Sequence, residues 1–272
     1  MPADSDPNNW GALSPDEIAL SERFLEDGFV ICDVDDRIAL DAIRQSVIGS
    51  LQERCDCESL DEKDLLDRFH EICKVEDLND IRVALMQVLN QEVLTLPRYF
   101  SLAKNALETL VGNELVMQKR LNLSIQLPGD TSSLLPIHAD VWSGDSPYEV
   151  VVWTPLVNCF ESKSMFILPP AETKILHQNF KDFREKSSED VFRAVESDLV
   201  WLEVPYGKTV VFNQNLPHGN RINIERETRW SLNCRFKSIF APYRDKKVGE
   251  FFVPITLRAA SRIGMAYQFP AF

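Results

Sequence analysis

Residues 207–237, GKTVVFNQNLPHGNRINIERETRWSLNCRFK, carry the pattern that decides the fold. A β-branched, apolar run ends in a polar turn, and a second strand pattern begins at Arg229. Successive side chains of a strand point to opposite sides of the sheet, so the two faces of this second strand differ. One face carries Arg229, Ser231, Asn233 and Arg235, and the other carries Trp230, Leu232 and Cys234. The stretch therefore predicts two β-strands, one of which has a polar face.

A strand-and-turn pattern of residues continues through the chain from about residue 114 onward. Short β-branched or aromatic runs alternate with Pro, Gly and Asn, which predicts a connected β region over 114–272. The clearest runs are MQKRLNLSIQLPGD (117–130), YEVVVWTPLVNC (148–159), SMFILPP (164–170), LVWLEVPYGKTVVFN (199–213) and FFVPITL (251–257). One segment, 178–198, is charged and helical in pattern. It predicts a helical insertion between strands, of the kind that often acts as a lid.

The first part of the chain predicts helices. Residues 1–14 are polar and predict a flexible arm, after which Ser14 caps a helix that Gly28 ends. A strand is predicted at 29–34 and a second helix at about 36–53, and 61–113 is helical in pattern almost throughout, LLDRFHEIC (65–73) included. The predicted class is α+β: a double-sheet β core with helical support from about 15–113 packed on one sheet. We expect residues 15–272 to form a single domain.

Composition limits the partners and the location. The chain has 272 residues, 42 of them acidic and 29 basic, and its net charge of −13 argues against nucleic acid as a partner. Its six cysteines match no zinc pattern, and no run is apolar and long enough to span a membrane. The first residues have no basic start and no apolar core of a signal peptide. These features predict a cytoplasmic protein with reduced thiols, and they leave its oligomeric state open.

Three of the side chains can converge on one metal ion. His138 and Asp140 lie two residues apart, so in an extended segment they point to the same side, about 6.6 Å apart. His218 ends a predicted strand and supplies a second imidazole. Two histidines and one carboxylate form the ligand set that suits Fe(II) in oxygen chemistry. His177 is a rival for the distal position, but it adjoins the charged insertion, whereas His70 is interpreted as an ordinary helix residue.

A second prediction concerns Arg229, which shares its strand face with Ser231. A buried guanidinium beside a hydroxyl suits a carboxylate, because the planar fork binds both oxygens. The alternative is an ion pair with Glu225 or Glu227, which are near in sequence. Arg235 lies on the same face, further from the predicted metal, and is interpreted as a substrate contact.

The order H-x-D, then His, then Arg resembles the Fe(II)- and 2-oxoglutarate-dependent oxygenases of the phytanoyl-CoA hydroxylase type. The likeness covers most of the chain and includes EDGFVICDV (26–34), EVVVWTPLVNC (149–159) and GKTVVFNQNLPHGN (207–220). It implies a double-stranded β-helix of the jelly-roll or cupin-like kind and the use of O2. It also implies that His138, Asp140 and His218 bind Fe(II), and that Arg229 with Ser231 binds the distal carboxylate of 2-oxoglutarate.

The resemblance also carries finer expectations. HADVWSGDSPYEVVVWTPL (138–156) most resembles oxygenases of carbohydrate and aminoglycoside biosynthetic clusters, which implies a small polar substrate of a sugar-containing or aminoglycoside type. Related halogenases carry a small residue at the position of Asp140, so this chain resembles a hydroxylase. Many relatives have P-G-S-H where this chain has LPPAETKILH (168–177), and this departure leaves the loop over the site undefined.

Other polar and aromatic residues complete the prediction. Asn122 and Ser124 alternate on LNLSIQL (121–127) and face either solvent or the pocket. Because family members often use a polar side chain of this strand against 2-oxoglutarate, both are predicted co-substrate contacts. Trp142 and Tyr148 are predicted to shape the substrate pocket, and Trp153 to pack in the core.

Two other functions are consistent with a jelly-roll. One is a cupin-type metal enzyme that does not use 2-oxoglutarate, although cupins usually have more histidine ligands than a chain with four histidines offers. The other is a non-catalytic module that binds a sugar or a partner, against which the intact set of three ligands argues.

Overall fold

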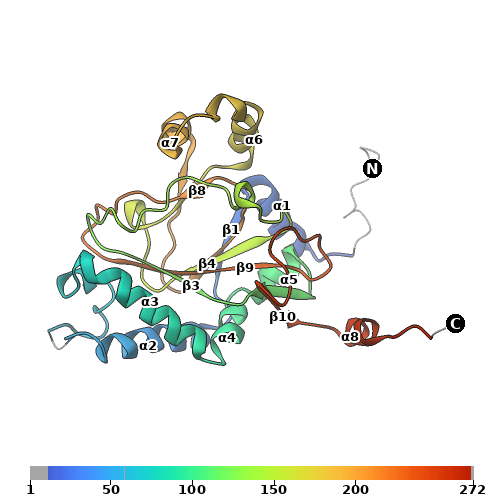
Figure 1. The fold of residues 1–272 in the computed structure, drawn as a ribbon, viewed down its shortest axis with the longest axis horizontal. Helices are drawn as coiled ribbons and strands as arrows, with labels where there is room; N and C mark the ends of the chain where they lie inside the picture. Colours follow the sequence, from blue (N-terminus) through green and yellow to red (C-terminus); the bar gives the residue numbers. More distant parts are fainter. Residues whose placement is uncertain (1–11, 58, 271–272) are drawn as a thin grey trace.

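The computed structural model describes residues 12–57 and 59–270, which form two antiparallel sheets with helices around them (Figure 1). The larger sheet has the strand order β1-β7-β4-β9-β2-β10, and β3 also pairs with β9; the smaller has the order β6-β5-β8. The larger sheet comprises β1 (Phe29–Asp33), β2 (Leu115–Gln118), β3 (Asn122–Gln126), β4 (Val150–Pro155), β7 (Lys208–Asn213), β9 (Arg229–Ser238) and β10 (Phe252–Thr256). The smaller comprises β5 (Phe166–Ile167), β6 (Val200–Trp201) and β8 (His218–Gly219). The predicted α+β class and its β-rich second part are confirmed.

Strand β9 is the centre of the larger sheet. It pairs with β4 along one edge, and its other edge pairs with β3 and then with β2. The predicted alternation of its side chains is confirmed, and its apolar face, which includes Trp230, is fully buried. The Trp230 indole packs edge-on against Phe69, with ring centroids 5.1 Å apart. Its Nε1 donates a hydrogen bond to the Leu66 carbonyl at 2.8 Å. The first part of the chain thus covers the apolar face of β9 and leaves the polar face free to line a pocket.

Helices cover both sides of this core. Figure 1 shows α2, α3 and α4 on one side of the strands and α6 and α7 on the other. The N-terminal helices are α1 (Pro15–Asp27), α2 (Arg37–Gln52), α3 (Val75–Gln91), α4 (Thr95–Ser101) and α5 (Lys104–Leu110). Helix α1 begins at the predicted cap, where Ser14 and Glu17 form a capping box, and ends at Gly28 in a left-handed conformation (φ 77°). A Cβ at Gly28 would lie 2.2 Å from the Leu216 side chain, so glycine is required there.

The predicted helix at 65–73 is wrong. This segment forms turns and a short 3-10 helix, η1 (Phe69–Glu71). Its backbone pairs with the chain ahead of β9: the Thr228 amide donates to the Asp67 carbonyl at 2.7 Å, and the His70 amide donates to the Thr228 hydroxyl at 3.2 Å. These long-range bonds replace the local bonds that a helix would make.

The predicted insertion is helical, but it begins earlier than 178. It comprises α6 (Pro170–Gln178), η4 (Phe180–Phe183), α7 (Ser188–Val195) and η5 (Glu196–Asp198). Its buried apolar residues Leu176, Val191, Phe192 and Val195 form a second core cluster together with Ile137, Phe166 and Leu168, which lie outside the insertion. Ile137 immediately precedes His138, and Phe166 belongs to β5, so the insertion supports the small sheet from behind. The lid role stays a prediction.

The last part of the described chain adds little to the core. Of the predicted arm at 1–14, residues 1–11 lie outside the described residues. The C-terminal helix α8 (Ala259–Ala266) leads away from the sheets in Figure 1 and has no buried residue. The extent of the single domain therefore stays a prediction. None of the helices that the structure describes is long and apolar enough to cross a bilayer.

Tyr99 on α4 links the helical layer to the sheet, and a substitution there tests how much this link contributes to stability. Its fully buried hydroxyl lies 2.9 Å from the Val152 carbonyl on β4 and 3.0 Å from the Leu232 carbonyl on β9. We expect Tyr99→Phe to lower the free energy of unfolding by about 1–2 kcal/mol, because a buried hydrogen bond is lost. Urea denaturation measures this change. The matched control is Tyr267→Phe at a residue 59% exposed, which should change nothing; equal effects of both would contradict the prediction.

Candidate metal centre and anion pocket

The three predicted metal ligands meet at one point. His138 and His218 pair through their backbones, each amide donating to the carbonyl of the other at 3.0 and 2.8 Å. Asp140 opens the short helix η2 (Asp140–Ser143) two residues after His138. One potential ligand atom from each of the three side chains lies within 4.8 Å of the others. Among the described residues, no other group of three or more His, Cys, Asp or Glu side chains has this geometry.

Backbone carbonyls fix the orientation of both imidazoles. The Nδ1 atom of His138 lies 2.8 Å from the Pro136 carbonyl, and that of His218 lies 2.9 Å from the Leu216 carbonyl. A carbonyl only accepts, so each Nδ1 carries the hydrogen and, in the neutral ring, Nε2 keeps its lone pair. This second hydrogen bond is the arrangement by which metal-binding histidines are usually held.

The protonation states also suit a cation. Burial lowers the pKa of His218 to about 4, so this ring is neutral at physiological pH. Burial alone would raise the pKa of Asp140, but hydrogen bonding from His138 and the charge of Arg235 hold it well below its usual value. Burial also disfavours the charge on His138, but the Asp140 carboxylate and the Pro136 carbonyl outweigh it and raise its pKa. The cluster therefore offers one anionic and two imidazole ligands once His138 has lost its proton.

The cluster lies at one side of a cavity of about 260 Å³ between the two sheets. The lining also includes polar side chains of β3 and β9, namely Asn122, Ser124, Arg229, Ser231, Asn233 and Arg235. The structure thus brings together the predicted ligands and the predicted co-substrate contacts. Asn122 and Ser124 face the pocket rather than solvent. Trp153 is part of the buried core, as predicted, and it also lines the cavity.

Arg229 is a buried cation without an acidic partner among the described residues. Its side chain donates to the Ser164 carbonyl at 3.0 Å and to the Ser124 hydroxyl at 2.9 Å. The residue is 3% exposed, and burial lowers its pKa to about 10. The alternative ion pairs are not formed, because Glu225 accepts from Ser162 and Glu227 pairs with Lys163. A positive charge buried in this way attracts an anion from outside the chain.

One nitrogen of Arg229 and the hydroxyls of two buried serines have no hydrogen-bond partner among the described residues. Arg229 Nε, Ser231 Oγ and Ser164 Oγ are buried and make no hydrogen bond. Such groups are rare in folded proteins, because each costs about 1–3 kcal/mol when it loses water without gaining a partner. A ligand with two carboxylate oxygens would satisfy Arg229 by the bidentate contact that guanidinium prefers.

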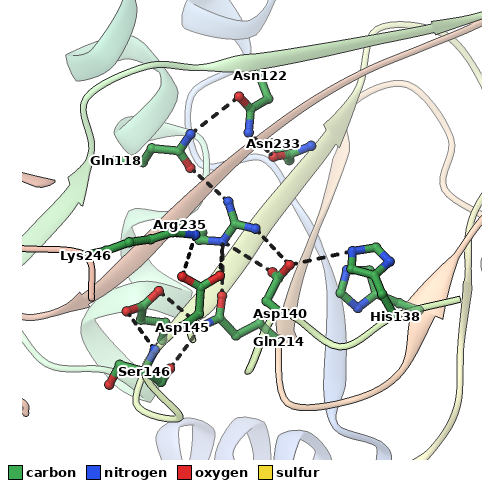
Figure 2. A network of polar contacts seen from close by, with 12 residues as sticks. Gln118, Asn122, His138, Asp140, Asp145, Ser146, Gln214, Asn233, Arg235 and Lys246 are labelled. Atoms are coloured by element: carbon green, nitrogen blue, oxygen red, sulfur yellow. Dashed lines mark hydrogen bonds and ion pairs between the residues drawn. The ribbon is translucent and has the colours of Figure 1, made fainter. Parts of the chain in front are cut away.

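The position expected for Arg235 is wrong. It does not lie further from the metal ligands: Nη2 is 2.8 Å from Asp140 Oδ1, and Nε is 3.2 Å from Asp140 Oδ2 (Figure 2). The η2 turn brings Asp140 over the second half of β9, and strand spacing alone does not show where a turn will lie. Arg235 also contacts Gln118, Gln214 and Asp145, none of which was predicted from the sequence as a site residue. Its predicted substrate contact stays untested.

Trp142 and Tyr148 do not line the cavity. Trp142 instead packs against Phe180 and His177, with ring centroids 4.8 Å and 6.1 Å apart. It thereby connects the η2 turn to the helical insertion. Tyr148 is 57% exposed. His177 lies on α6 within this aromatic group and outside the metal-ligand cluster, which removes the rival distal ligand.

Solved structures share this architecture. The structure is similar to the nickel complex of the non-heme monooxygenase ThoJ (16% identity, 91% of this chain and 92% of that one, TM-score 0.51). It is also similar to EctD from S. alaskensis with 2-oxoglutarate and 5-hydroxyectoine (17%, 95% and 90%, 0.55). A third is the non-heme α-ketoglutarate-dependent carbocyclase SnoK from nogalamycin biosynthesis (16%, 90% and 98%, 0.52). No protein-family model matches the chain, and no curated protein matches its sequence. These likenesses confirm the predicted resemblance at the level of the fold.

The raised pKa of His138 predicts how metal binding depends on pH. A cation that uses all three ligands must displace the His138 proton, whereas His218 stays neutral down to about pH 4. Lowering the pH from 8 to 6 should weaken Co(II) affinity, by up to about tenfold per pH unit below the pKa of His138. Titrations followed by Co(II) absorption at each pH test this. An affinity that stays constant over this range would show that His138 is not a ligand.

Proposed function

We propose that this chain is a non-haem Fe(II) enzyme that uses 2-oxoglutarate and O2, built on a double-stranded β-helix. The observation that carries the proposal is the sharing of one cavity by two complementary sites. One is the group of His138, Asp140 and His218, and the other is the unpaired Arg229. A dicarboxylate that reaches from Arg229 to the metal would satisfy both sites.

The residues present fit this pair of ligands. Two imidazoles and one carboxylate leave the other positions of an octahedral ion open, as enzymes that activate O2 on Fe(II) require. Arg229 and Ser231 would bind the distal carboxylate, and Ser124 would hold Arg229 in place through its hydrogen bond. Asn122, whose amide donates to Asn233 at 3.0 Å, would line the path between the two sites.

The bound iron would supply the oxidation chemistry, coupled to decarboxylation of 2-oxoglutarate to succinate. The chain's own part is to bind, orient and exclude water. The backbone pairing of His138 with His218 fixes two ligands, and burial keeps His218 neutral. Val151 and Phe212 give the cavity apolar surface, which limits water around the reacting groups.

We infer that the reaction is a hydroxylation, so that the enzyme is a dioxygenase. With a metal bound, Asp140 would be the ligand at the place that related halogenases leave for halide. The predicted substrate is a small polar metabolite, of the sugar-containing or aminoglycoside type that the resemblance implies. Of the predicted substrate contacts, Arg235 lines the cavity, whereas Trp142 and Tyr148 do not, and a contact of any of the three with substrate stays a prediction. A cupin-type enzyme that does not use 2-oxoglutarate would leave the buried charge of Arg229 unexplained, and we do not favour it.

The first test of this function uses anaerobic Fe(II) with 2-oxoglutarate. We expect a weak visible charge-transfer band in the wild type and none in His218→Ala, which loses iron. Arg229→Gln should keep the iron and raise the dissociation constant of 2-oxoglutarate roughly 30-fold or more, because truncating a buried charge contact costs about 2 kcal/mol or more.

The matched control for Arg229→Gln is Arg226→Gln, at an exposed arginine in the loop before β9, which should bind 2-oxoglutarate as the wild type does. No band in the wild type at saturating concentrations would overturn the co-substrate assignment. Equal affinity in Arg229→Gln would show that another residue anchors it.

Ser231 allows a test that separates binding from stability. Its buried hydroxyl makes no hydrogen bond in the protein alone, so Ser231→Ala removes no internal bond. We expect an unchanged or slightly higher free energy of unfolding, together with a roughly tenfold or greater loss of 2-oxoglutarate affinity, because hydrogen bonds to charged groups contribute about 1.5–3 kcal/mol. Denaturation and calorimetric titration on the same samples measure both. A loss of stability without a loss of affinity would contradict the proposed contact.

A further inference from the structure

Arg235 and Asp140 form an ion pair that joins one of the candidate metal ligands to strand β9. Two nitrogens of the guanidinium face two oxygens of the carboxylate, at 2.8 Å (Nη2 to Oδ1) and 3.2 Å (Nε to Oδ2). This is the bidentate arrangement in which both position and plane of the carboxylate are fixed. A carboxylate has about four lone-pair directions, so the pairing leaves others free for a cation.

Three further side chains contact the guanidinium of Arg235, as Figure 2 shows. Its Nε lies 3.2 Å from Gln214 Oε1 and 3.7 Å from Asp145 Oδ2, and its Nη1 lies 3.4 Å from Gln118 Oε1. Asp145 is 1% exposed and also pairs with Lys246. The guanidinium therefore cannot follow Asp140 if that side chain turns.

Gln214 is fixed in the same way. Its amide group donates to the Ser146 carbonyl at 2.9 Å and to a Glu149 carboxylate oxygen at 3.1 Å. This leaves Gln214 Oε1 facing Arg235, so the amide cannot turn over without losing these bonds. The support for the metal ligand thus extends over two further layers of side chains.

We propose that Arg235 is a positioning residue of the metal centre: it fixes the direction of the Asp140 carboxylate so that Oδ1 faces the two imidazoles. The inference rests on one part of the proposed function, the binding of a metal ion by His138, Asp140 and His218, and not on the use of 2-oxoglutarate. Asp140 opens a short 3-10 turn, and its Oδ1 lies 3.6 Å from His138 Nε2. Without the Arg235 guanidinium, the Asp140 carboxylate could rotate about two side-chain bonds. Metal binding would then have to order this side chain, at a cost in conformational entropy.

The rival role for Arg235 is that of a simple counter-charge, and the two roles predict opposite signs. A positive charge so near the metal repels it, so removing a mere counter-charge would strengthen binding of a cation. Removing a positioning residue weakens binding, because partners of metal ligands typically contribute about 10- to 100-fold in affinity. Metal affinity alone therefore separates the two roles.

The experiment titrates Co(II), without 2-oxoglutarate, into the wild type, Arg235→Gln and Arg235→Lys, and follows the Co(II) absorption. We expect both variants to bind about 10- to 100-fold more weakly. Lysine keeps the charge and loses the planar fork, so it should not rescue. Unchanged or tighter binding in Arg235→Gln, or wild-type binding in Arg235→Lys, would overturn the proposal.

A second measurement remains informative if those variants fold poorly. Asp140→Ala removes the ligand carboxylate, and added formate should restore part of the Co(II) affinity, because Arg235 can hold formate where the carboxylate was. Formamide, neutral and similar in shape, is the control and should have no effect. The double variant Asp140→Ala with Arg235→Gln should show no rescue. Absent rescue in the single variant, or equal rescue in the double variant, counts against Arg235.

These outcomes are distinct from a failure of the proposed function. If the wild type binds Co(II) and the Arg235 variants bind it equally well, the positioning role is wrong and the function stands. If the Arg235 variants weaken Co(II) as expected but 2-oxoglutarate never changes the wild-type spectrum, the proposed co-substrate is wrong and the positioning role stands. If the wild type binds no Co(II), both are wrong.

Discussion

The reciprocal backbone pairing of His138 with His218 is the contact on which the candidate site depends. It joins the segment ahead of η2 to β8, a short edge strand of the small sheet. Two imidazoles thereby lie side by side with ring centroids 4.4 Å apart, although the residues are far apart in sequence. The helical insertion stabilises this pairing from behind, because Ile137 is part of the cluster that the insertion buries. A change in the insertion that moved the small sheet would therefore move two ligands together.

The part of the cavity lining around Arg229 has groups that are unfavourable in the protein alone. A globular chain normally pairs its buried polar atoms, yet Arg229 and Ser231 keep unpaired atoms at 3% and 0% exposure. The large sheet can tolerate this because the opposite face of β9 is densely packed, with Trp230 fixed to the helical layer. Local stability is thus lower at the position where an anion would restore it, a common property of ligand-binding sites.

The sequence was sufficient to predict features that depend on local periodicity. The two-residue spacing of His138 and Asp140 and the alternation from Arg229 onward were correct, because an extended chain fixes the side to which each residue points. Features set by tertiary contacts were not accessible. The helix expected at 65–73 did not form, because the Asp67 carbonyl and the His70 amide form hydrogen bonds with Thr228 instead of within a helix. The position of Arg235 depended on where the η2 turn lies, for which the sequence contains no periodic signal.

The two arginines on the polar face of β9 show how one strand can serve two purposes. They share a residue type and a sheet face, but differ in the acids around them. Arg235 lies against Asp140 and near Asp145, so its charge is neutralised within the chain and its fork is available for orientation. Arg229 has no carboxylate partner among the described residues and is fixed only by neutral groups, so its charge is available to a ligand. The distribution of acids, rather than the arginines themselves, separates the part of the cavity that orients the metal ligand from the part that attracts an anion.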